Sequence, residues 1–222
     1  VVSTACYVAR IRGVRSAVPM FQALKLCPEA VVVRPRMEAY SEASRAIREM
    51  MLELTPEIEP LSLDEAFLDV SSSVRLFGDE IAIAKRIKER IREETSLAAS
   101  VGVAPNKLVA KIASDLDKPD GLVVVSTENL HATLDPLSAA VIPGIGRVTQ
   151  EKMRRVGIRS IHDLRSAPNK VLERLFGRYA GRMRERANGI DDRPVVAERR
   201  EKSISAEETF DIDLEQRSVL DT

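Results

Sequence analysis

Helical and strand-like segments alternate between residues 37 and 125, and this alternation constrains the fold more than any other feature. Apolar residues recur at helical spacing over 38–54 and over 79–95, with charged residues between them. A shorter segment, 107–115, also has a helical pattern. Short apolar runs that predict strands lie between the helices, at 58–63, 66–70, 98–103 and 122–125. Helices and strands mixed in this order predict an α+β layer fold with the helices on one face of the sheet.

The flanking segments have a different character. Before residue 37 the pattern predicts two short helices, at 4–12 and 20–26, and a short strand at 30–33. Gly13 would end the first helix in the left-handed conformation that glycine adopts without strain. Residues 126–192 are nearly all helical in pattern, whereas 193–222 opens with a proline and contains a strand-like stretch at 202–210.

Composition excludes several classes of protein. No run of 18 or more apolar residues is present, so we expect no membrane span. The two cysteines, Cys6 and Cys27, lack metal-ligand spacing, and we interpret them as free thiols in a reducing cytoplasm. His131 and His162 have no ligand-like neighbours, so we expect neither to bind a metal.

Charge is balanced over the chain but not along it. The 34 basic residues equal the 34 acidic ones, yet residues 147–202 contain sixteen Lys and Arg against eight Asp and Glu. This asymmetry is typical of a surface that tracks DNA beside an acidic metal site. Arginine-rich helices with merely solvated faces explain the composition equally well.

Two adjacent carboxylates, Asp64 and Glu65, separate two of the predicted strands. A turn here would place both at the edge of the sheet, since neighbouring residues of a straight strand face opposite sides. Mg²⁺ prefers oxygen ligands and shares them with phosphates, so such a pair fits phosphoryl transfer. By itself the pair is weak evidence, because most such pairs are merely exposed turn residues.

Five stretches together resemble the Y-family of translesion DNA polymerases, and most closely its DNA polymerase IV (DinB-type) branch. Residues 62–69 (Ser-Leu-Asp-Glu-Ala-Phe-Leu-Asp) resemble the first palm motif, and 100–121 the second. The other three resemble the fingers motif, the thumb hairpin and the entry to the little finger, at 2–19, 142–146 and 202–210. They occur in the family's order and cover essentially the whole chain.

The resemblance implies an α+β chain with a ferredoxin-like palm, small α/β fingers and a helical thumb that contains a helix-hairpin-helix. The implied domains are part of the fingers (1–36), the palm (37–125), the thumb (126–192), and the linker with the start of the little finger (193–222). On this alignment the first palm strand, with its Asp and steric gate, and most of the little finger fall outside the chain.

The resemblance also implies roles for individual residues. Asp64 and Glu65 match the catalytic carboxylates that bind two Mg²⁺ ions. Four residues match those that hold the incoming triphosphate in the family: Thr4, Tyr7, Arg10 and Lys118. Their hydroxyl, guanidinium and ammonium groups are suited to phosphate oxygens. We expect Asp69 and Asp115 to be structural acceptors, and Asn106 and Lys107 to cap and support a helix.

Further positions match surfaces that face DNA. Ser3 and Ala17 match the small residues that roof the nascent base pair, where small side chains would leave room for a damaged template base. Residues of the thumb hairpin and of the little-finger entry match DNA-binding positions: Gly144, Gly146, Arg147, Lys202 and Ser203. Backbone N–H groups at such a hairpin would bind a phosphate without reading sequence.

The function implied is template-directed transfer of a nucleotide from a dNTP to a primer 3′-OH, across damaged DNA and in the cytoplasm. The alternative is a DNA-binding or scaffolding relative without catalysis, against which the retained Asp64, Glu65 and Lys118 argue. The implied partners are primer–template DNA, dNTP and, for the intact parent, a sliding clamp. Without the third palm carboxylate we expect the chain alone to be nearly inactive, and a bare palm edge to favour an edge-strand dimer.

Overall fold

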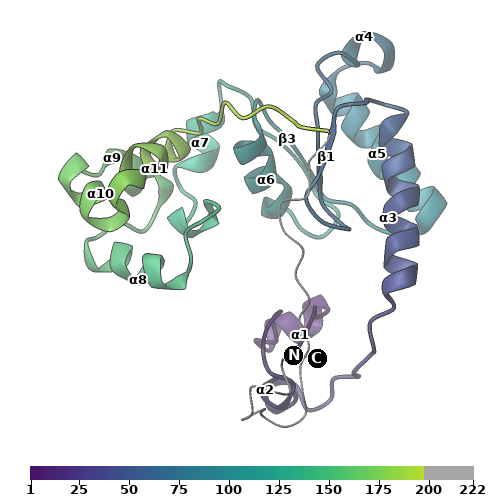
Figure 1. The fold of residues 1–222 in the computed structure, drawn as a ribbon, viewed down its shortest axis with the longest axis horizontal. Coiled ribbons are helices and arrows are strands. Elements are labelled where there is room, and N and C mark those ends of the chain that lie inside the picture. Colours follow the sequence, from purple (N-terminus) through teal and green to yellow (C-terminus); the bar gives the residue numbers. More distant parts are fainter. Residues whose placement is uncertain (198–222) are drawn as a thin grey trace, which may run out of the picture.

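A computed structural model describes residues 1–197, and its elements fall into three regions (Figure 1). The first region contains two short helices, α1 (Tyr7–Ile11) and α2 (Met20–Leu26). The long helix α3 (Met37–Leu52) leads from it to the second region, which combines strands with helices. The third region is entirely helical and lies on the other side of helix α6 (Lys107–Leu116).

The second region contains two small sheets. Strand β1 (Ile58–Pro60) pairs antiparallel with β2 (Ala66–Leu68), and β3 (Val101–Val103) pairs in parallel with β4 (Leu122–Val124). Within residues 1–197 no ladder joins the two sheets. Helix α4 (Val74–Phe77) precedes α5 (Glu80–Thr95), which packs against α3 and β3, while α6 packs on β3 and β4.

Close approach of α6 to β3 depends on a glycine. A Cβ atom at Gly102 would lie 2.2 Å from the carbonyl oxygen of Ala110, far inside van der Waals contact. Any side chain at this position would therefore push the helix away from the strand.

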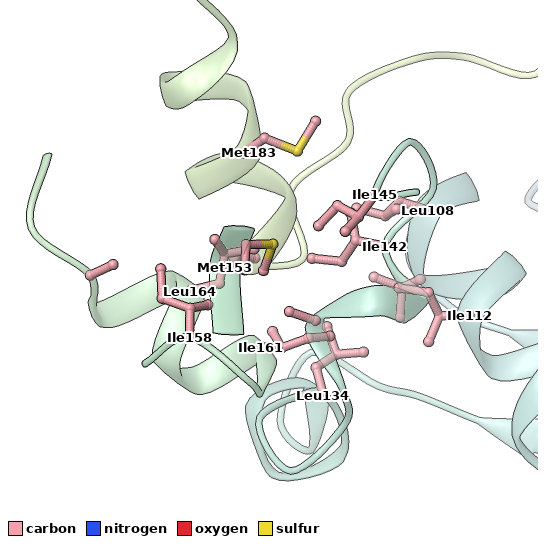
Figure 2. Packing of buried hydrophobic residues seen from close by; sticks show 14 of the residues in the cluster. Leu108, Ile112, Leu134, Ile142, Ile145, Met153, Ile158, Ile161, Leu164 and Met183 are labelled. Atoms are coloured by element: carbon pink, nitrogen blue, oxygen red, sulfur yellow. The ribbon is translucent and has the colours of Figure 1, made fainter. Parts of the chain in front are cut away.

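The third region consists of short helices around one apolar core. Leu134, Ile142 and Met153 are almost completely buried there, and Leu108 and Ile112 of α6 belong to the same cluster (Figure 2). Helix α6 thus contributes to the core of the helical region as well as to the sheet layer. The elements are α7 (Leu130–Leu134), η1 (Ala139–Val141), α8 (Arg147–Arg155), α9 (Ile161–Ser166), α10 (Asn169–Phe176), η2 (Gly177–Tyr179) and α11 (Ala180–Ala187).

After α11 the chain returns over the sheet layer and is fastened to it. The amide of Asn106 donates to the Gly189 carbonyl at 2.7 Å, and Lys107 Nζ donates to the Pro194 carbonyl at 2.6 Å. Lys107 Nζ also lies 2.5 Å from Glu59 Oε2, which accepts the Val196 N–H at 3.0 Å. This buried ion pair therefore joins β1, α6 and the segment that leaves the helical region.

The expected α+β class and most of its helices are confirmed, but the strand predicted at 30–33 is wrong. Val31, Val32 and Val33 are exposed and, within residues 1–197, no strand offers them ladder hydrogen bonds. Apolar β-branched sequence favours extended chain, but a strand also requires a partner. The strand-like stretch at 202–210 lies outside the described residues. No helix in the described part combines the length and apolarity needed to cross a membrane.

Candidate active site

The turn between β1 and β2 carries the two predicted catalytic carboxylates. The backbone N–H groups of Leu61 and Ser62 both donate to the Glu65 carbonyl, at 2.8 and 3.2 Å, and close the turn. The Ser62 hydroxyl donates to Asp64 Oδ1 at 2.7 Å, which orients that carboxylate. Asp64 is exposed and Glu65 half-buried, so both carboxylates stand at the end of the β1–β2 sheet.

A row of alternating charge continues from this turn along α6. Lys111 Nζ lies 2.8 Å from Glu65 Oε1 and 3.3 Å from Asp115 Oδ2. Asp115 Oδ1 in turn lies 2.6 Å from Lys118 Nζ. Three successive ion pairs thus connect Lys118, a predicted triphosphate ligand, to Glu65. Sequence reasoning missed Lys111, although its spacing of four residues from Asp115 places both on one helix face.

The pKa values of this row have identifiable causes. Burial raises the pKa of Asp115, but a hydrogen bond from Lys118 and the charge of Lys111 outweigh it, so the pKa lies below its usual value. Burial lowers the pKa of Lys111, but the hydrogen bond to Glu65 and the charge of Asp115 raise it above its usual value. Both groups are therefore charged at neutral pH. Asp115 is an acceptor as expected, and so is Asp69, which accepts from the Ser71 N–H at 2.9 Å.

The donor set of the turn suits a hard cation. Among the residues that the structure describes, no group of three or more His, Cys, Asp and Glu could hold a metal ion. Mg²⁺, however, is commonly held by one or two carboxylates together with substrate phosphates. Asp64 and Glu65 fit that requirement, and Lys118, a predicted phosphate ligand, lies at the other end of the same row.

The predicted fingers residues form a second group around α1. Arg10 Nε donates to the Ala5 carbonyl at 2.8 Å, and its Nη2 donates to Thr4 Oγ1 at 3.3 Å. The same guanidinium lies 5.2 Å from the centre of the Tyr7 ring, over its face. Thr4, Tyr7 and Arg10 are all exposed, so the structure brings the three together as one polar, accessible patch.

Ser3 and Ala17 occupy adjoining stretches of backbone beside this patch. The Val2 N–H donates to the Val18 carbonyl at 2.9 Å, and the Ala17 N–H donates to the Val2 carbonyl at 2.9 Å. Both small side chains are exposed, and Ala17 has a φ of +66° in the left-handed region. This conformation could not be predicted from the residue type, because alanine seldom adopts it.

The fingers patch and the palm carboxylates remain separate groups. Helix α1 lies apart from β1 and α6 at the far end of α3 (Figure 1). Over residues 1–197 no hydrogen bond or ion pair joins Tyr7 or Arg10 to Asp64, Glu65 or Lys118.

The hairpin before α8 contains the two glycines that are predicted to contact a phosphate. Gly144 has a φ of +95°, which favours glycine. Gly146 is the N-terminal cap of α8, and a Cβ atom there would meet nothing within 4 Å, so its backbone is open to a ligand. Arg186 Nη1 donates to the Pro143 carbonyl at 2.7 Å and steadies the hairpin. Arg147 is 92% exposed and pairs with Glu151 at 3.4 Å.

Several arginines of the basic segment are structural. Arg184 donates to the carbonyls of Arg165 and Ala167, both at 2.5 Å, and Arg165 pairs with Asp135 at 2.5 Å. Three basic side chains of α8 make no hydrogen bond or ion pair within residues 1–197, so they are accessible to a ligand: Lys152, Arg154 and Arg155. The predicted DNA contacts Lys202 and Ser203 lie outside the described residues.

Two family models match the chain in the order of these regions. The model described as "impB/mucB/samB family" matches residues 1–115, and that described as "DNA polymerase-iota, thumb domain" matches residues 140–191. The chain is therefore a member of the impB/mucB/samB family. A curated relative, DNA polymerase IV of Pseudomonas paraeruginosa, is 48% identical over 214 residues, which is 96% of this chain and 61% of the relative. The chain thus spans about three fifths of the length of the curated relatives it matches.

Solved structures show the same arrangement. The crystal structure of DinB from Sulfolobus solfataricus matches with a TM-score of 0.79 and 34% identity, over 87% of this chain and 57% of that one. An insertion ternary complex of Dbh DNA polymerase matches with a TM-score of 0.78 and 35% identity, over 87% and 57%. The resemblance to Y-family polymerases is confirmed, and with it the palm and the helix-hairpin-helix thumb.

Proposed function

We propose that this chain forms most of the catalytic core of a translesion DNA polymerase, which adds nucleotides from dNTP to a primer 3′-OH on a damaged template. The observation that carries the proposal is the row from Glu65 through Lys111 and Asp115 to Lys118. It connects a carboxylate turn suited to Mg²⁺ with a cation suited to phosphate. The fold and the family support the same reaction class.

In this proposal each group of residues has a separate task. Tyr7, Arg10 and Lys118 hold the triphosphate from the fingers and palm sides, with Thr4 orienting the Arg10 guanidinium. Asp64 and Glu65 would hold the two Mg²⁺ ions, which neutralise charge on the attacking and leaving oxygens. Ser3 and Ala17 lie over the base pair, where small side chains exclude few misfits and leave room for a lesion.

The thumb would hold the primer–template. The open backbone at Gly146, together with the turn at Gly144, would approach one phosphate, and Arg147 would add charge beside it. These contacts are blind to sequence, as synthesis on any template requires. The same proposal includes domain boundaries at residues 36, 125 and 192. It also includes a cytoplasmic location and, for the intact parent, a sliding clamp as partner.

Binding of a triphosphate tests the site directly. The chain would be titrated with dNTP and Mg²⁺ in the presence of a primer–template whose primer ends in a dideoxynucleotide. We expect Arg10→Gln and Lys118→Gln each to weaken dNTP binding by about tenfold, the loss typical of one charge-assisted contact. Lys85→Gln, an exposed lysine on α5, is the matched control. Equal affinities for all four proteins would contradict the proposal.

The low activity expected of the chain alone stays a prediction. Primer extension with Mg²⁺ and dNTP would compare the chain with its Asp64→Ala/Glu65→Ala variant. We expect neither to extend the primer, since two carboxylates hold two cations weakly. Extension by the unmodified chain only would refute the expected inactivity and leave the polymerase assignment standing.

A further inference from the structure

A lysine on α5 holds the loop that carries Lys118. Residues 117–121 connect α6 to β4, and Lys88 reaches this loop from the side. Its Nζ lies 2.8 Å from the Asp120 carbonyl oxygen, 2.8 Å from Asp120 Oδ1 and 3.1 Å from the Gly121 carbonyl oxygen. A fourth acceptor, the Ala99 carbonyl oxygen, lies at 2.5 Å.

These contacts use the whole capacity of the ammonium group. A lysine has three N–H donors, and here four acceptor oxygens surround them. The Lys88 side chain is only 16% exposed, so water competes little for these donors. Lys88 therefore has no donor left for a ligand. Its ammonium group donates only to oxygens of the loop and of the segment before β3 among residues 1–197.

The loop has a conformation that needs such support. Asp120 has a φ of +61°, in the left-handed region that residues other than glycine rarely occupy. Arg92, one turn further along α5, also forms an ion pair with the Asp120 carboxylate. The hydrogen bond from Lys88, followed by that from Arg92, holds the pKa of Asp120 below its usual value despite opposing burial.

Other restraints act on the two ends of the loop. Asp117 and Gly121 pack closely, since a Cβ atom at Gly121 would lie 2.2 Å from the Asp117 carbonyl oxygen. The Val101 N–H donates to the Gly121 carbonyl at 3.0 Å, and the Gly121 N–H donates to Ser100 Oγ at 3.2 Å. Within residues 1–197 the one side-chain contact of Lys118 is its ion pair with Asp115. Its backbone lies between the end of α6 and Asp120, so the contacts that α5 makes with Asp120 restrain it from the side away from α6.

We propose that Lys88 is a positioning residue for the triphosphate subsite, which fixes the loop 117–121 so that the Lys118 ammonium faces the phosphates. The inference rests on the proposed function, because it takes Lys118 as a phosphate ligand. Lys88 acts on nucleotide binding through Lys118 and through no contact of its own.

A double-mutant cycle tests this relation. The dissociation constant of dNTP with Mg²⁺ and dideoxy-terminated primer–template would be measured for the full chain and for Lys88→Met, Lys118→Gln and the double variant. We expect Lys88→Met to weaken binding about fivefold or more, as for coupled residues of one network. In the Lys118→Gln background the same change has no further effect. Lys85→Met, on the same helix, is the control and leaves binding unchanged.

The outcomes separate the two claims. If Lys118→Gln weakens binding but Lys88→Met does not, or the two effects add fully, the role of Lys88 is refuted and the proposed function stands. If Lys118→Gln has no effect, the proposed role of Lys118 fails and the inference fails with it.

Hydrogen exchange without nucleotide separates positioning from general loss of fold. We expect Lys88→Met to speed amide exchange in residues 116–124 while α8 to α11 exchange as in the unmodified chain. Unchanged exchange in 116–124 would overturn the inference whatever the binding data show.

Discussion

The ion pair between Lys107 and Glu59 should be the most sensitive electrostatic contact in the palm. The two side chains are only 9% and 11% exposed, and each also bonds to the segment that follows α11. Replacement of Lys107 by methionine keeps most of the apolar stem but removes the ammonium group beside the buried Glu59 carboxylate. Breaking a buried pair from one side typically costs about 3 to 5 kcal/mol.

We therefore predict that Lys107→Met lowers the free energy of unfolding by about 3 to 5 kcal/mol. The same change also removes the hydrogen bond from Lys107 Nζ to the Pro194 carbonyl.

Urea unfolding followed by far-ultraviolet circular dichroism measures the change, with a matched control on the same helix. Lys111→Met removes the same group from a pair whose side chains are 27% and 38% exposed, and should cost less than about 1 kcal/mol. Glu59→Gln/Lys107→Met contains no buried charge and should be more stable than Lys107→Met alone. If Lys107→Met and Lys111→Met cost the same, the argument from burial is refuted.

Three further predictions follow from particular contacts. Gly102→Ala should destabilise the chain by about 2 to 3 kcal/mol in urea unfolding, because the new Cβ atom would meet the Ala110 carbonyl. Gly181→Ala has open space around it and should stabilise α11 by about 0.5 to 1 kcal/mol. Equal effects of the two substitutions would contradict the close approach of α6 to β3. Hydrogen bonds from Arg193 hold the pKa of Asp191 below its usual value. The Asp191 carboxylate therefore stabilises the folded chain at pH values above its unfolded pKa of about 4, and this stabilisation is lost as the pH falls from there through the folded pKa. Asp191→Asn should therefore make the free energy of unfolding in urea depend less on pH below about 4. The same dependence on pH in both proteins would contradict this role of Asp191. Within residues 1–197 no third strand pairs with either sheet, so these edges should pair two copies at high concentration; a strict monomer in light scattering would exclude this edge-strand dimer.

Much of the local structure could be predicted because it depends on local signals. Apolar spacing located α3 and α5 to within two residues at either end, and Asn106 caps α6 as expected by accepting the Val109 N–H at 3.0 Å. The adjacent pair Asp64 and Glu65 lies in a turn, as the flanking strand patterns require.

The parts that were missed depend on contacts distant in sequence. The strand expected at 30–33 needs a partner that its own residues cannot specify. The contact between Lys88 and Asp120 joins positions 32 residues apart, and that between Lys107 and Glu59 joins positions 48 apart. The sequence does not distinguish one lysine on a helix from another. Only the packing of distant segments decides which lysine donates to backbone carbonyl oxygens and which is exposed to solvent.

The most direct test of the central claim is whether the template controls triphosphate binding. The dissociation constant of one dNTP with Mg²⁺ would be measured for this chain without DNA, with a dideoxy-terminated primer–template that presents the complementary base, and with one that presents a mismatch. We predict the tightest binding with the complementary template and markedly weaker binding without DNA. The same affinity in all three conditions would contradict a template-directed polymerase core.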